Sequence, residues 1–106
     1  MGLFDRLRRS PRGGTLDRGA GRADVRHLEQ FVASRRGVEG YVEPRTAVTE
    51  TTIVLVAADG EWTRRRIEGP DTARRLSRDL AIPVYDAQVT GYPQRMREWS
   101  SREKER

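Results

Sequence analysis

The sequence predicts an α+β fold, in which two helices form a single layer on a mainly antiparallel four-stranded sheet. The predicted chain order is α-β-β-β-α-β. Residues 51–67, TTIVLVAADGEWTRRRI, join an apolar β-branched run to a polar run through Asp59-Gly60. An Asp-Gly pair between two such runs is a strong hairpin signal and is typical of a type I′ turn. Segments with helical periodicity lie before and after this strand-rich region, which indicates one small mixed domain.

A first helix is expected from Asp24 to about Arg36, because apolar residues recur at helical spacing between Val25 and Val32. Asp24 is placed to cap its start. Gly37 is placed to end it in the left-handed conformation.

Three strands should follow this helix. Residues 38–43 alternate between apolar and polar side chains and end at Pro44, which is typical of a half-buried strand. Residues 53–56 are apolar on both faces, which favours a central position in the sheet. Residues 62–67 form the third strand, with Trp62, Arg64 and Arg66 on one face and Thr63, Arg65 and Ile67 on the other.

A second helix is expected from about Pro70, with its end set by Pro83. Residues 84–89, VYDAQV, are then predicted to form the fourth strand, with Tyr85, Ala87 and Val89 pointing inward.

The C-terminal segment should turn at Tyr92 and continue into a short helix with the sequence QRMREWSS. Met96 and Trp99 are three residues apart there, so both could dock on the core or on a partner. The small α+β domain is therefore predicted over residues 24–99, and residues 100–106 are predicted to be a disordered charged tail.

The N-terminal part is predicted to lie outside this domain. Residues 1–9 place Leu3, Phe4 and Leu7 on one helical face, whereas residues 10–22 are rich in glycine and resemble a flexible basic linker. So short a helix is marginal in water, so the start is either frayed, bound to a partner or in weak contact with a membrane surface.

The basic excess lies at the two ends of the chain. The net charge is +4 for residues 1–23, −1 for residues 24–90 and +2 for residues 91–106. A near-neutral core weakens a nucleic-acid interpretation, because that binding requires clustered basic side chains. No apolar run is long enough to span a bilayer and the start lacks a signal-peptide pattern, so a cytoplasmic location is expected.

Composition excludes several chemistries. The chain has no cysteine, which removes thiol catalysis, disulfides and thiolate metal sites. His27 is the only histidine, so it is expected to be structural or solvent-facing. We therefore expect no catalysis, no metal and no cofactor.

Two sets of side chains remain as candidate partner-binding residues. One is the stripe on the third strand, where aromatic and arginine side chains suit either an interface or phosphate contact. The other is the apolar side of the C-terminal segment. The function predicted is a small interaction module that binds a protein partner. The alternative is an RNA- or DNA-binding accessory protein that uses Arg64, Arg66 and the basic tails. The stripe could also be a plain solvated sheet face. The candidate residues are Trp62, Arg64, Arg66, Tyr92, Met96 and Trp99.

The predicted element order resembles two known architectures. Double-stranded RNA-binding domains share α-β-β-β-α, but this chain lacks a lysine-rich start to its second helix. The restriction-endonuclease-like fold shares the whole order, and its catalysis needs an Asp near the second strand and Glu-x-Lys on the third. This chain has Thr51-Thr52 and Arg64–Arg66 at those places, so the resemblance extends to the fold without the active site.

The segments GVEGYVEP, VLVAADGEWTRRR and IPVYDAQVTGYPQRMR also resemble an uncharacterised family of short actinobacterial proteins. The resemblance covers about residues 24–99. It implies a source and domain limits, and no activity.

Overall fold

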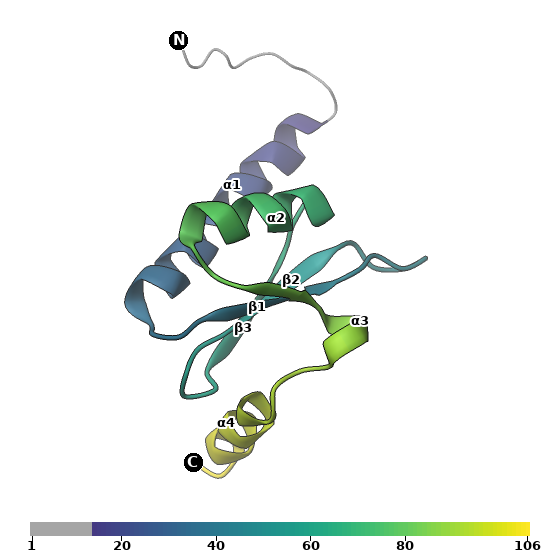
Figure 1. Ribbon diagram of the computed structural model, residues 1–106. Helices are drawn as coiled ribbons and strands as arrows, with labels where there is room; N and C mark the ends of the chain where they lie inside the picture. Colours follow the sequence, from purple (N-terminus) through teal and green to yellow (C-terminus); the bar gives the residue numbers. More distant parts are fainter. Residues whose placement is uncertain (1–13) are drawn as a thin grey trace.

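A computed structural model describes residues 14–106, with side chains described from Gly21 onward (Figure 1). The predictions for residues 1–9 lie outside this part. The α+β class is confirmed: four helices accompany an open, mixed four-stranded sheet. The elements are α1 (Gly14–Ser34), β1 (Glu39–Glu43), β2 (Thr52–Val56), β3 (Trp62–Arg66), α2 (Pro70–Leu80), β4 (Val84–Asp86), α3 (Ala87–Thr90) and α4 (Gln94–Lys104).

The strands lie in the spatial order β3-β2-β1-β4, which differs from their order along the chain. β1 pairs antiparallel with β2, and β2 pairs antiparallel with β3. β4 pairs parallel with β1, because α2 carries the chain back across the sheet before β4 begins. β2 therefore has a neighbour on both sides, as its apolar sequence predicted.

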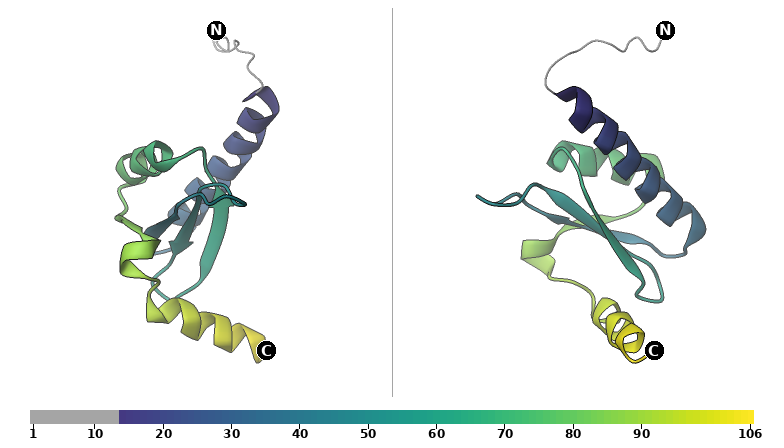
Figure 2. Two further views of the ribbon diagram at one scale, coloured as in Figure 1. Left: turned by 90° about the vertical axis from the view of Figure 1, so that its right-hand side faces the viewer. Right: turned by 180° about the vertical axis from the view of Figure 1, so that it is seen from behind.

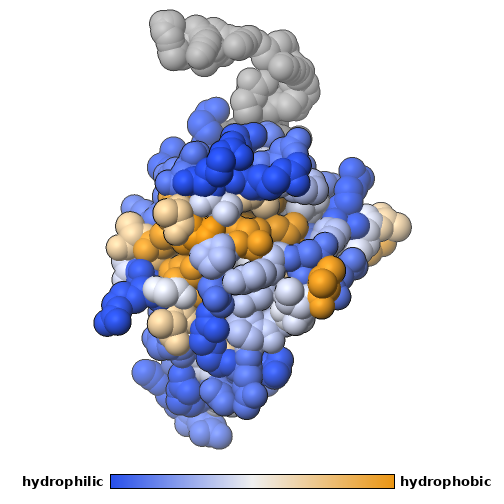
Figure 3. All heavy atoms as spheres, viewed as in Figure 1, coloured by the Kyte–Doolittle hydropathy of each residue, from blue (hydrophilic) through white to orange (hydrophobic). Residues whose placement is uncertain are grey.

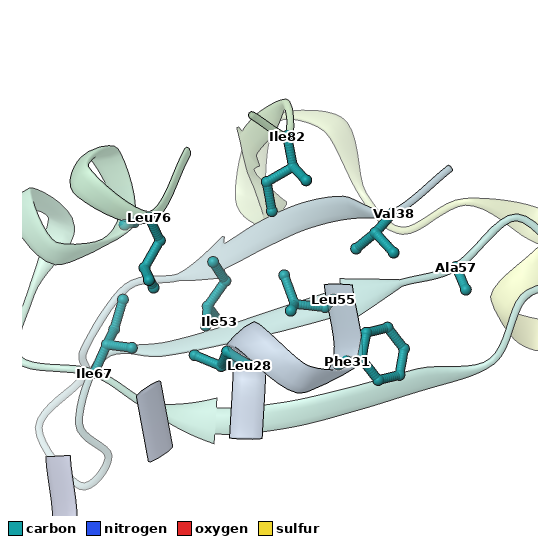
Figure 4. Close-up of a cluster of buried hydrophobic side chains, with 10 residues drawn as sticks. Leu28, Phe31, Val38, Ile53, Leu55, Ala57, Ile67, Leu76 and Ile82 are labelled. Atoms are coloured by element: carbon teal, nitrogen blue, oxygen red, sulfur yellow. The ribbon is translucent and has the colours of Figure 1, made fainter. Parts of the chain in front are cut away.

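The main core lies between the sheet and the helices α1 and α2, which cover the same face (Figure 2). Leu28 and Phe31 of α1 pack in one cluster with Ile53 and Leu55 of β2. Leu76 of α2 belongs to the same cluster (Figure 4). Both helices thus bury their apolar stripes against one sheet surface, which is where most of the hydrophobic stabilisation arises.

A second, smaller cluster lies on the opposite face of the sheet. Tyr41, Val54 and Val56 are buried there with Ala87 of α3. The C-terminal segment supplies further apolar side chains to this cluster. The predicted single layer of helices is therefore not confirmed, because α3 and the chain after it contribute to the face that α1 and α2 leave open (Figure 1).

Helix α1 begins at Gly14, earlier than the predicted start at Asp24. Asp24 lies inside the helix, and its carboxylate pairs with Arg65 of β3 at 3.5 Å instead of capping a terminus. Adding one residue to an existing helix is far easier than starting one, so α1 continues through a glycine-rich stretch. Gly37 has the predicted positive φ, 62°, just after the helix.

The fourth strand is shorter than predicted. β4 ends at Asp86, whose side chain accepts a hydrogen bond of 2.8 Å from the Gln88 N–H and so caps α3. Of the three side chains expected to point inward, only Ala87 is buried. Tyr85 is 39% exposed and Val89 is 81% exposed. The capping aspartate is the physical reason, since it begins a helix where alternation alone indicated a strand.

The Asp59-Gly60 hairpin is confirmed, but the type I′ turn is wrong. Within this turn only Gly60 has a positive φ, 96°. The Gly60 N–H donates to the Ala57 carbonyl at 2.9 Å, and the Ala57 N–H donates to the Glu61 carbonyl at 2.8 Å. This is the pattern of a three-residue loop that closes on a left-handed glycine.

Candidate interaction surface

Two residues of the β3 stripe predicted from the sequence, Trp62 and Arg64, lie on the face opposite α1 and α2. The strand register places Arg64 beside Val54 and Trp62 beside Val56. Both valines belong to the second cluster. Arg65 points to the other face, as the alternation predicted.

The C-terminal segment packs on this stripe. The indole N–H of Trp62 donates to the Ser100 hydroxyl of α4 at 2.8 Å. Tyr92 and Met96 pack against the same buried cluster as Trp62, and Trp99 lies against the turn that contains Gly60. The structure thus brings together two sets of residues that the sequence presented as separate docking surfaces.

Glu43 is the centre of a polar network at one end of the stripe. The Arg64 guanidinium donates two hydrogen bonds to its carboxylate, of 2.8 and 3.0 Å. The hydroxyls of Thr52 and Tyr92 donate to it as well. Burial opposes ionisation of Glu43, but these donors outweigh it and lower its pKa to about 2. Arg64 also lies 5.3 Å from the centre of the Trp62 ring.

The other two arginines of β3 lie in different surroundings. Arg65 reaches Asp24 and the Nδ1 atom of His27, which is 3.3 Å away. The Nε2 atom of His27 is 2.7 Å from the Thr63 hydroxyl. Burial and the nearby Arg65 charge lower the pKa of His27, which is a structural histidine between α1 and β3. Arg66 lines a groove between α1 and α2. The three arginines therefore do not converge on one surface.

Helix α4 is held by contacts that sequence reasoning missed. The Arg95 side chain donates to the Ala57 carbonyl at 2.9 Å and pairs with Glu39 at 2.7 Å. Arg102 donates to the Asp59 carbonyl at 3.1 Å. The helix consequently continues to Lys104, past the predicted domain boundary at residue 99. Glu39 of β1 was the available signal, since this acidic side chain pairs with Arg95 of the basic helix.

A groove of about 510 Å³ lies beside the Glu43 network, and we call it the loop groove. One wall is the connection between β1 and β2, and another is α3. Arg64 and Tyr92 also line it. Val48 of the connection is 90% exposed and Val89 of α3 is 81% exposed, and both adjoin residues that line the groove. Figure 3 shows this hydrophobic surface at α3 among hydrophilic neighbours.

No three His, Cys, Asp or Glu side chains of the described residues form a group that could hold a metal ion. Within residues 14–106, none of the helices combines the length and apolar composition needed to cross a bilayer. Comparison with protein-family models, curated proteins and solved structures finds no match to the chain.

The Glu43 network makes the free energy of unfolding depend on pH in the acidic range. Because the pKa of Glu43 is lowered from 4.5 to about 2, its contribution is fully present above pH 4.5 and is lost as the pH falls toward 2. We expect this contribution to be about 2–3 kcal/mol, after allowance for the partly exposed Arg64.

Between pH 7 and pH 3, the free energy of unfolding in urea should therefore change less with pH for the Glu43→Gln variant than for the parent. Glu50→Gln, at an exposed position of the same connection, is the matched control and should keep the parent profile. Equal slopes for all three proteins would contradict the role given to Glu43.

Proposed function

We propose that the protein is a small interaction module that binds a protein partner at the loop groove and performs no catalysis. The observation that carries this proposal is the pair of exposed valines, Val48 and Val89, each next along the chain to a residue that lines the loop groove. Apolar side chains that remain exposed next to a concave surface are typical of interaction sites. A cytoplasmic location and the actinobacterial family resemblance belong to the same proposal.

The six candidate residues divide into groups under this proposal. Arg64 and Tyr92 line the loop groove and would contact the partner directly. Three others would act indirectly, by holding the C-terminal segment in place beside the loop groove: Trp62, Met96 and Trp99. The sixth, Arg66, lies at the other groove.

The alternative, RNA or DNA binding, has less support from the same geometry. A phosphate contact by Arg64 would compete with its two hydrogen bonds to Glu43. Arg65 and Arg74 also have carboxylate partners. Electrostatic binding of nucleic acid needs several uncompensated charges on one surface, so dispersed and paired arginines favour a protein partner.

A finer description of the fold also stays a proposal. The α-β-β-β-α-β order supports a restriction-endonuclease-like core that lacks the catalytic residues of that class. Thr51 and Thr52 precede or begin β2, and three arginines end β3. A carboxylate-bound cation is not expected at these positions.

Affinity capture from the native cell, with and without nuclease, tests the proposed function. We expect the same partner under both conditions, and its loss with Val48→Asp/Val89→Asp. These positions are exposed, so the double variant should fold normally. Arg64→Ala is a poorer test, because it would also leave the Glu43 carboxylate without its main donor.

Ala33→Asp/Ser101→Asp adds the same charge at exposed positions of α1 and α4 and should keep the partner. A partner that disappears after nuclease treatment would favour nucleic-acid binding. A partner retained by Val48→Asp/Val89→Asp would exclude the loop groove.

A further inference from the structure

A second groove, on the helical face, has a different chemical character. It lies between α1, α2 and the end of β3, has a volume of about 360 Å³, and we call it the helix groove. Four arginines line it: Arg22 and Arg26 of α1, Arg66 of β3 and Arg75 of α2. Val25 gives it half-buried apolar surface, and Ile67 also lines it but is only 6% exposed.

The charge of the helix groove is positive. Glu29 and Glu68 also line it, so four guanidinium groups face two carboxylates. Within the part of the chain whose side chains are described, neither Arg66 nor Arg75 forms an ion pair with a carboxylate. This contrasts with Arg64 and Arg65, whose charges have partners inside the molecule.

We propose that the helix groove binds an acidic amphipathic segment of a protein partner. The apolar side chains of that segment would contact Val25 and the aliphatic parts of the arginine side chains, and its carboxylates would pair with the guanidinium groups. Guanidinium groups bind carboxylates through two parallel hydrogen bonds, which suits such a rim. The site is independent of the loop groove, so either can be correct without the other.

The apolar surface favours a peptide over a nucleic acid. A phosphate backbone would pair with the arginines and leave Val25 without a matching apolar surface. An acidic amphipathic helix offers apolar residues and carboxylates on adjoining faces. A groove of this volume has room for a few side chains of such a helix, since ligand pockets begin at about 300 Å³.

Gly21 provides a way to block the groove without removing a charge. A Cβ atom added at this position would have no neighbour within 4 Å. Because Gly21 itself lines the groove, we expect a leucine at this position to occupy part of it, and leucine favours the helical state of α1 more than glycine does.

Fluorescence anisotropy of labelled peptides on the full chain tests the proposal. The probe is EELLEELLEELL, and the control peptide ELELELELELEL has the same composition without one apolar helical face. We expect saturable binding of the probe and weaker binding of the control. Arg66→Gln/Arg75→Gln should raise the probe's Kd about tenfold, since two partly exposed ion pairs are lost.

Arg78→Gln/Arg97→Gln removes two exposed arginines outside the groove and should leave Kd within about twofold of the parent. Gly21→Leu should abolish binding while Tm stays equal or rises. That result separates a blocked groove from a damaged fold.

Three outcomes would overturn the proposal. The first is either no saturable binding of the probe or an equal change of its Kd by the two double variants, Arg66→Gln/Arg75→Gln and Arg78→Gln/Arg97→Gln. The second is tighter, equally arginine-dependent binding of a thymidine oligonucleotide of about twelve nucleotides, which would make the groove a nucleic-acid site. The third is probe binding seen only after Leu3→Ser/Phe4→Ser/Leu7→Ser, which would assign the groove to the chain's own N-terminal segment.

Discussion

Replacement of Leu55 by alanine is expected to lower the free energy of unfolding by about 2–5 kcal/mol. Leu55 is 1% exposed and belongs to the cluster between β2 and the helices α1 and α2. The substitution removes apolar surface from the core and leaves a cavity that the close-packed neighbours fill only in part. Urea unfolding followed by circular dichroism measures the difference.

Val48→Ala is the control for this experiment, because it removes apolar carbon at a position that is almost fully exposed. Its effect should stay within about 0.5 kcal/mol. A loss below about 1 kcal/mol for Leu55→Ala would contradict the packing of β2 described above.

Gly60→Ala should have the second large effect, lowering the free energy of unfolding by about 2–4 kcal/mol. Gly60 has a φ of 96°, which an alanine adopts only with strain. A Cβ atom there would also overlap the carbonyl oxygen of Arg95 and lie 2.9 Å from the Cβ of Trp99. Helix α4 would have to move away, and the hydrogen bond between Trp62 and Ser100 would be lost with it.

Tryptophan fluorescence gives a direct readout of that movement. Trp62 and Trp99 are the only tryptophans. Trp99 belongs to α4 and lies against the Gly60 turn, and Trp62 donates a hydrogen bond to Ser100 of α4, so their emission should shift to the red when α4 detaches. Gly69→Ala is the control, since a Cβ there meets nothing within 4 Å. Unchanged emission and stability for Gly60→Ala would show that α4 is not held at this turn.

Local patterns in the sequence predicted most of the sheet. The hairpin around Asp59-Gly60 and the division of β3 into two faces follow from strand alternation and turn chemistry, which depend only on neighbouring residues. The type of turn was not predictable in the same way. It depends on how many residues the paired strands leave in the loop, and the Ala57–Glu61 pairing left three.

The sequence indicated which residues could belong to the candidate site, but it did not predict how those residues are arranged in space. Aromatic and arginine side chains on a strand look the same in sequence whether they await a partner or contact the same chain. The short helix around Trp99 was predicted from the sequence. The contacts that hold it on the sheet were not, because Arg95 reaches Glu39 and Ala57 only in the folded chain.

The parallel pairing of β4 with β1 bears on the order of folding. β1, β2 and β3 pair with their neighbours in the chain, whereas Val84 meets Gly40 only after α2 has crossed the helical face. Contacts between distant residues form late, because the chain entropy lost in closing a long loop comes before any gain. We therefore expect β4, α3 and α4 to dock after the hairpins. Until they dock, Val54 and Val56 would present an uncovered apolar surface, so we expect slower C-terminal docking to increase aggregation of the refolding chain.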